Sequence, residues 1–209
     1  GLIGKATTAA ANFDHSAAIP SIQGDYILWT VVVNRNKIPM SGVSVVDEVQ
    51  AGHDLVIDDI HPLAVKKNSE AALNYTGSAL AQVNGTLSGI TGTGFTFTLP
   101  AGPWSDTYTL TFYTKLNQTG LNGMYKNGTS TFVNRATLKG HGSDIMVSST
   151  KTYNLEMLNK SLAAGYHFTT RTVQWKLTVN RNKLPMANGI VTDYLPDYMS
   201  LTPSGAAAF

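Results

Sequence analysis

The sequence predicts an all-β protein made of tandem immunoglobulin-like antiparallel β-sandwiches, the second copy being truncated. Three observations lead to this prediction. Apolar and polar residues alternate with a period of two along several segments, and no long stretch holds the 3.6-residue period of a helix. Asn-Gly dipeptides, which favour tight turns, separate these segments. A sequence of 19 residues from the first half of the chain returns near its end.

The repeat begins at Trp29 and returns at Trp175. Ten of its 19 aligned positions are identical without a gap, including the segment Asn-Arg-Asn-Lys and the final aspartate. The offset from Trp29 to Trp175 is 146 residues. Solenoid repeats recur every roughly 20 to 50 residues, so the repeated unit is a whole domain. We therefore predict a complete domain at residues 1–148 and the N-terminal part of a second copy at residues 149–209.

The predicted strands follow in order along the chain. Alternation is clear in residues 26–34, 95–99, 108–115 and 131–138. Hairpin-type dipeptides are Asn84-Gly85, Asn122-Gly123, Asn127-Gly128 and Asn188-Gly189. Prolines that end or interrupt strands are Pro39, Pro100, Pro103 and Pro185. The Ala-rich stretch at residues 6–18 fits either a short helix or an insertion, and we place the domain boundary near Ser148.

Composition limits the classes of function. Only 13% of the residues are charged, and a net charge of +2 without a Lys/Arg run argues against nucleic acid or an anionic membrane as a partner. The chain has no cysteine, which excludes disulfides and thiolate chemistry. A Thr-rich all-β array without cysteine fits the surface of a Gram-positive bacterium better than the cytosol. The sequence has no signal peptide, sorting signal or membrane span, so we expect the signal and the cell-wall anchor to lie outside it.

Polar residues occupy core-facing positions in several predicted strands. Asn134 and Asp47 each share the parity of apolar neighbours on their own strands, and so do Lys160 and Asp193 in the second copy. A buried lysine, aspartate or asparagine is costly when it stands alone. Each residue by itself is more simply explained as a polar strand-end residue that bonds to the backbone. Together, on matching faces, they favour a joint chemical role.

That role is a covalent cross-link. A lysine amine that is desolvated in an apolar core has a lowered pKa and can act as a neutral nucleophile. A carboxyl group in the same surroundings has a raised pKa, stays protonated and can donate a hydrogen bond to an asparagine carbonyl. Attack of the amine then gives a Lys–Asn isopeptide bond and releases ammonia. The reaction occurs once per molecule, so it is maturation rather than enzymatic turnover.

Four segments, in this order, resemble the collagen-binding-domain family of Gram-positive cell-wall adhesins. They are the strand at 29–34, the turn with Asp47, the strand at 108–114 and the Phe-Val-Asn-Arg-Ala segment at 132–136. The resemblance implies a variant immunoglobulin sandwich that binds collagen or another host matrix protein. It also implies an intramolecular isopeptide bond, with Asn134 as the acceptor and Asp47 as the proton relay.

The resemblance identifies the lysine through the second copy. Lys160, which precedes Asp193, looks like the first-strand lysine of the family. In the first copy Lys5 precedes Asp47 by a longer interval, so its assignment as the cross-linking lysine requires a nine-residue insertion through the Ala-rich stretch. Lys37 falls in the repeated turn, where we expect it to be solvated. The cross-link would close a loop of roughly 130 residues and stabilise the fold by about 4 to 5 kcal/mol.

The second copy has Lys160 and Asp193 but no asparagine downstream, so it cannot close its own bond. Its open sheet edges predict strand exchange or dimerisation. The functional prediction is a cell-surface adhesin module that binds collagen or a similar matrix protein. The alternative is a pair of non-binding stalk or spacer domains of a surface protein or pilus.

No other motif indicates catalysis, and we expect neither a metal ion nor a cofactor. The histidines, which are scattered without ligand spacing, are His15, His53, His61, His141 and His167. Aspartates that we interpret as solvated loop residues are Asp54, Asp58 and Asp59. Aromatic residues that could line a groove, but that we assign to core and sheet packing, are Trp104, Tyr108 and Tyr113.

Overall fold

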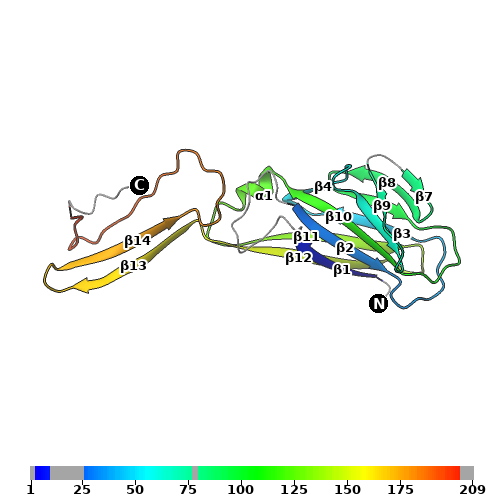
Figure 1. Ribbon diagram of the computed structural model, residues 1–209, viewed down its shortest axis with the longest axis horizontal. Coiled ribbons are helices and arrows are strands. Elements are labelled where there is room, and N and C mark those ends of the chain that lie inside the picture. Colours follow the sequence, from blue (N-terminus) through cyan, green and yellow to red (C-terminus); the bar gives the residue numbers. More distant parts are fainter. Residues whose placement is uncertain (1–2, 10–25, 77–79, 203–209) are drawn as a thin grey trace.

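The structure, a computed structural model, describes residues 3–9, 26–76 and 80–202, with the backbone alone for residues 3–9 and Leu80. Figure 1 shows two packed β-sheets and a two-stranded hairpin that projects from one end of them. All strand pairs are antiparallel. The all-β, immunoglobulin-like fold class is therefore confirmed. Among the described residues, no helix is long and apolar enough to cross a membrane.

The first sheet has the strand order β1-β2-β10-β5-β6, and β4 also pairs with β10. Its strands are β1 (Ile3–Ala9), β2 (Tyr26–Val33), β4 (His53–Val56), β5 (Leu63–Lys67), β6 (Leu73–Tyr75) and β10 (Tyr108–Leu116). The second sheet has the order β12-β11-β3-β9-β8-β7. Its strands are β3 (Ser44–Val49), β7 (Leu80–Gln82), β8 (Gly85–Thr91), β9 (Gly94–Thr98), β11 (Gly128–Lys139) and β12 (Ile145–Leu155).

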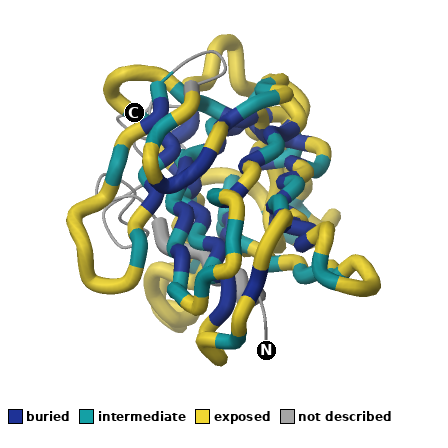
Figure 2. Tube along the Cα trace, turned by 90° about the vertical axis from the view of Figure 1, so that its right-hand side faces the viewer, coloured by how far each residue is buried: buried dark blue, intermediate teal, exposed yellow. Residues whose placement is uncertain are grey.

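The core lies between the two sheets, where the period-two alternation predicts it. Every second residue of β2 and of β10 is buried. Figure 2 shows buried and less buried positions alternating along the strands. Large side chains that are fully enclosed include Trp29, Phe97, Phe112 and Tyr153. Because antiparallel sandwich strands present one face to the core, this pattern alone predicts most of the interior.

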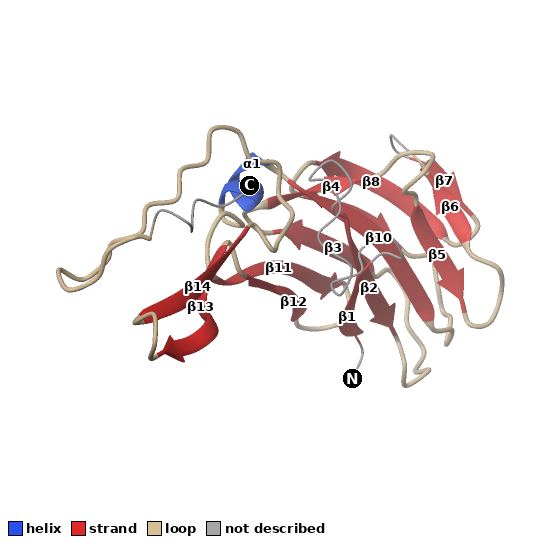
Figure 3. Cartoon of the chain, turned by 60° about the vertical axis from the view of Figure 1, so that its left-hand side comes forward, coloured by secondary structure: helices blue, strands red, loops and turns tan. Residues whose placement is uncertain are grey.

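A short helix departs from the prediction. Asn122-Gly123 predicts a hairpin, but α1 (Gln118–Asn122) ends there instead. The Asn117 side chain caps the helix by accepting a hydrogen bond from the Gly120 amide at 3.1 Å. In Figure 3, α1 lies at the end of the sandwich nearest the hairpin. The predicted hairpin turn at Asn84-Gly85 does join β7 to β8.

The hairpin consists of β13 (Leu158–His167) and β14 (Thr172–Val179). Between it and the sandwich, β12 runs through the boundary predicted near Ser148. Its ladder with β11 continues without a break to Leu155, so residues 149–155 pair with the first sandwich. Of the Ala-rich stretch, residues 6–9 belong to β1, and residues 10–18 lie outside the described residues.

The repeated sequence forms the same turn in both places. Asn34 and Asn180 have φ of 60° and 56°, in the left-handed region that asparagine tolerates. The Asn34 side chain donates to the Ile38 carbonyl at 2.8 Å and accepts from the Ile38 amide at 3.0 Å. Asn180 makes the same two bonds to Leu184, at 2.6 and 2.9 Å. The division into two domains stays a prediction, but in this turn the two copies share their structure as well as their sequence.

Candidate functional site

The structure brings Asp47 and Asn134 together inside the sandwich. Adjacent strands β3 and β11 carry them, and the register pairs Ala136 with Asp47. Asn134, two residues away, is therefore a diagonal neighbour of Asp47 on the same face. Its Nδ2 donates to Asp47 Oδ1 at 2.7 Å and to the Glu48 carbonyl at 3.3 Å. Asn134 is completely buried and Asp47 is 2% exposed, as the strand parity predicts.

The amide oxygen of Asn134 is the unusual atom of this pair. Among the described residues, nothing donates a hydrogen bond to Asn134 Oδ1, although it is buried. Exchanging the positions of the amide oxygen and nitrogen leaves the shape of the side chain nearly unchanged. In that flipped orientation the carbonyl oxygen would lie beside the Asp47 carboxyl group. A protonated carboxyl could then donate to it, which is the polarisation that amine attack requires.

Lys5 lies in β1, at the edge of the first sheet and alongside β12. The register pairs Lys5 with Val31, whose side chain is fully buried. Directly opposed residues in an antiparallel pair share a face. Position 5 is therefore on the core-facing side of the first sheet, while Asp47 and Asn134 belong to the second. A bond between Lys5 and Asn134 would join the two sheets.

The second copy repeats this register. Lys160 pairs with Leu177, and Leu177 is the residue that aligns with Val31 in the sequence repeat. Lys160 thus occupies the position in the hairpin that Lys5 occupies in the sandwich. The interval in sequence between the lysine and the residue that it pairs with runs from position 5 to 31 in the first copy and from 160 to 177 in the second. The first interval is longer by nine, the length of the predicted insertion, which falls between the two strands.

Lys160 and Asp193 are also brought together. The Lys160 ammonium lies 2.7 Å from Asp193 Oδ1 and 3.0 Å from Oδ2, and 4.9 Å from the centre of the Trp175 ring. About a third of each charged side chain is exposed. Lys160 and Asp193 therefore meet, but both residues are exposed and Asp193 lies outside any strand, so the core-facing positions predicted for them are not observed. Lys37 is exposed in its turn, as expected.

Sequence reasoning missed a row of buried, hydrogen-bonded polar side chains beside this site. The Trp29 indole donates to Thr114 Oγ1 at 2.7 Å, and Thr114 Oγ1 lies 2.8 Å from His53 Nδ1. His53 Nε2 lies 3.0 Å from the carbonyl oxygen of Val133, the neighbour of Asn134. Since the Val133 carbonyl can only accept, a neutral imidazole carries its proton on Nε2, and the threonine hydroxyl then donates to Nδ1. Thr114 shares the parity of the apolar residues Leu110 and Phe112 on its own strand, which was the signal available in the sequence.

The remaining candidates have structural roles. Asp58 accepts hydrogen bonds from the Ile60 and His61 amides, and Asp54 accepts one from Asn117. No group of three or more metal-ligating side chains occurs within residues 26–76 and 80–202 or on β1. Trp104 and Tyr108 pack edge to face at 5.0 Å against the core, in agreement with the packing assignment. His15 lies outside the described residues.

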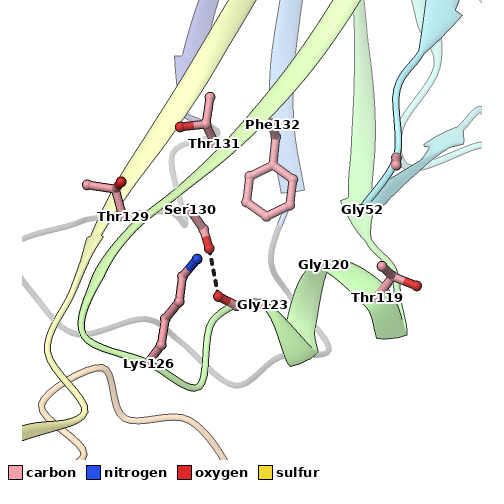
Figure 4. Close-up of a pocket in the computed structure, with 10 residues that line it drawn as sticks. Gly52, Thr119, Gly120, Gly123, Lys126, Thr129, Ser130, Thr131 and Phe132 are labelled. Carbon is pink, nitrogen blue, oxygen red and sulfur yellow. Dashed lines mark hydrogen bonds between the residues drawn. The ribbon is translucent and has the colours of Figure 1, made fainter.

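A shallow open pocket lies between α1 and β11 (Figure 4). The Phe132 ring forms part of its wall, and Lys126 extends beside it. The Ser130 hydroxyl donates to the Gly123 carbonyl at 2.7 Å, which closes one side. The backbones approach closely here, because a side chain at Gly120 would overlap the Gly52 carbonyl oxygen. The pocket offers a mixed polar and apolar surface with one cation, Lys126.

Comparison with known proteins decides the family. The model of the collagen binding domain family matches residues 21–149, which is more than half of the chain. The chain belongs to this family. The resemblance noted in the sequence is thereby confirmed, and the matched residues include both Asp47 and Asn134. None of the curated proteins compared with the chain matches it significantly.

Several solved structures are similar to the chain at low sequence identity. The collagen binding subdomain of the Enterococcus faecalis surface protein ACE is 14% identical, with 75% of this chain and 97% of that one covered and a TM-score of 0.46. The RrgA Jo.In complex is 14% identical, with 73% and 79% covered and a TM-score of 0.50. The T6 backbone pilin of Streptococcus pyogenes is 12% identical, with 78% and 38% covered and a TM-score of 0.47.

Proposed function

We propose that this chain is part of a bacterial surface adhesin and that its first domain binds collagen or a similar matrix protein. The family match across residues 21–149 supports this proposal most directly. It is consistent with the near-neutral charge of the chain. An extracellular location on a Gram-positive cell wall is part of the same proposal.

The alternative is a spacer function, in which the domains hold a binding tip away from the cell. The specific observation in its favour is the tandem repeat, since an array of stiff domains serves reach as well as binding. A pulldown on immobilised collagen, fibrinogen and fibronectin separates the two functions. Binding to collagen at micromolar protein supports the adhesin; no binding to any of the three supports the spacer. Thr129→Arg, in the open pocket, would weaken binding if collagen contacts that surface, whereas Thr109→Arg on β10 serves as a control.

The second part of the proposal is the cross-link between Lys5 and Asn134. The neutral Lys5 amine attacks the Asn134 Cγ, so that a new Nζ–Cγ bond forms and the Cγ–Nδ2 bond breaks. Asp47 first donates its proton to the amide oxygen and then carries a proton from the amine to the leaving nitrogen. That nitrogen departs as ammonia while the carbonyl re-forms and its oxygen returns the first proton to Asp47. Burial of Asp47 and Asn134, their 2.7 Å contact and the register of Lys5 support this sequence of steps.

The second copy has the lysine and the aspartate without an acceptor. We propose that the open edge of β14 and the apolar side chains beside it associate with strands from another chain or another part of the parent protein. Exposed apolar residues there include Leu162, Trp175, Leu177 and Val179. Light scattering across a concentration series tests this: a mass that rises toward that of a dimer supports exchange, and a constant monomer mass contradicts it.

A further inference from the structure

The repeated Asn-Arg-Asn-Lys turn makes different contacts in its two settings. In the second copy it lies against the end of the first sandwich. Asn182 Oδ1 accepts a hydrogen bond from the Glu156 amide at 2.7 Å, and its Nδ2 lies 3.5 Å from the Met124 carbonyl oxygen. The Asn182 side chain is only 6% exposed as a result. The neighbouring Arg181 forms an ion pair with the Glu156 carboxylate.

Apolar burial accompanies these polar contacts. Leu184 is 2% exposed and belongs to the same buried cluster as the core of the first sandwich. The Tyr125 hydroxyl donates to the Pro185 carbonyl at 2.9 Å. One turn thus docks through a hydrogen-bonded amide, an ion pair and a buried leucine. An isolated surface ion pair contributes little to stability. Here the ion pair is accompanied by a buried hydrogen bond and a buried leucine, so the contact forms a specific interface.

The surface that receives the turn is itself held in place. We name it the pole, and it consists of residues 124–127 with Glu156. Asn127 Oδ1 accepts hydrogen bonds from the Met157 and Leu158 amides at 2.6 and 3.0 Å, and its Nδ2 donates to the Leu158 carbonyl at 2.7 Å. These bonds fix the chain where it passes from β12 into β13. The pole therefore presents its groups in a defined geometry.

In the first copy the same turn is exposed. Arg35, Asn36 and Lys37 all face solvent, although Asn34 closes the turn with the same two hydrogen bonds as Asn180. Among the described residues, the Arg35 and Asn36 side chains make no hydrogen bond or ion pair. Neither side chain therefore contributes a polar contact to the part of the first sandwich that the structure describes. Both are nevertheless repeated at Arg181 and Asn182, where they make the docking contacts.

We propose that the turn at residues 34–39 is a docking surface for the pole of another copy of this domain, joined on its N-terminal side. Asn36 would accept from the amide equivalent to Glu156, Arg35 would pair with that glutamate, and Ile38 would take the place of Leu184. Copies of the domain would then stack head to tail through one repeated set of contacts. The pole of this chain is already filled by its own second turn, so the partner is a copy whose pole is free.

The test places such a copy ahead of the chain. Ile3 pairs with Val33 as Leu158 pairs with Val179, so residues 1–157 joined to residues 3–209 reproduce the native junction. The protein then has two junctions, an upstream one at the first Glu156 and the native one downstream. Amide hydrogen exchange at both glutamates reports docking, since each amide should be bonded to an asparagine of the following turn.

We expect both Glu156 amides to be protected from exchange. Asn36→Ala in the second full copy should speed exchange at the upstream glutamate by about tenfold and leave the downstream one unchanged. Asn182→Ala should do the reverse, and Asn74→Ala, at an exposed asparagine, should affect neither. An unprotected upstream amide beside a protected downstream one would overturn the proposal. So would upstream protection that Asn36→Ala leaves intact, because another segment would then cover the pole. Collagen binding and the cross-link play no part in either result.

Discussion

The buried chain from Trp29 through Thr114 to His53 gives the sharpest prediction about stability. Thr114→Val keeps the shape of the side chain but removes its hydroxyl. The Trp29 indole loses the acceptor it has at 2.7 Å, and His53 Nδ1 loses the donor it has at 2.8 Å. Both side chains are almost fully buried, so water cannot readily replace the lost partner.

The magnitude follows from these two losses. Each buried polar group that loses its partner costs about 1–3 kcal/mol. Two such groups, offset in part by the added methyl group and by local relaxation, should lower the free energy of unfolding by about 2–4 kcal/mol. Urea denaturation followed by circular dichroism measures this difference, and the slope with urea should stay unchanged if the folded state keeps its extent of burial.

Thr111→Val is the matched control. Thr111 lies on the same strand but on the half-exposed face, where its hydroxyl makes no hydrogen bond to the described residues. The change there should stay within about 0.5 kcal/mol. If Thr114→Val were as mild as Thr111→Val, the hydrogen-bonded chain would contribute nothing measurable and the reasoning would be refuted.

Three further predictions concern single residues. Burial raises the pKa of Tyr75 to about 12, helped by the nearby Tyr108. The contribution of Tyr75 to the free energy of unfolding is therefore complete below pH 10 and is lost as the pH rises toward 12. Tyr75→Phe should flatten this alkaline loss of stability in a pH series of thermal unfolding, and an unchanged dependence on pH would contradict it. Gly120→Ala should lower the free energy of unfolding, measured by urea denaturation, by about 3 kcal/mol or more, because the added Cβ would overlap the Gly52 carbonyl oxygen. A wild-type urea midpoint would show instead that the loop moves easily. Asn34→Ala should lose about 2–3 kcal/mol, because it removes three side-chain hydrogen bonds and places an alanine at positive φ. Asn34→Gly should lose less because only the bonds are missing; equal losses would argue against backbone strain.

The strands were predictable because their signal is local. In β2 and β10, alternation identifies both the strand and its buried face, and in β3 and β11 it also identifies Asp47 and Asn134 as interior residues. That these two residues meet depends on the pairing of β3 with β11, which are far apart in the sequence. Parity predicts which side of a strand a residue faces, and only the register determines its neighbour.

What the sequence could not predict depends on tertiary contacts. The helix at residues 118–122 is too short for a periodic pattern, and its cap at Asn117 also fits a turn. His53 has no spacing that marks it, and its role follows from strands β4 and β10 lying side by side. The contacts of the second turn with the pole were likewise hidden, because identical residues at Asn36 and Asn182 differ only in what lies next to them.

The central claim is a covalent bond between Lys5 and Asn134, and the intact mass of the denatured protein tests it most directly. The wild type should be lighter than its sequence by one ammonia, and Lys5→Ala, Asp47→Ala and Asn134→Ala should each keep the full mass expected for the variant. A wild type at full mass would contradict the cross-link. Loss of ammonia that persists in Lys5→Ala alone would show that another lysine is the nucleophile, against the register that pairs Lys5 with Val31.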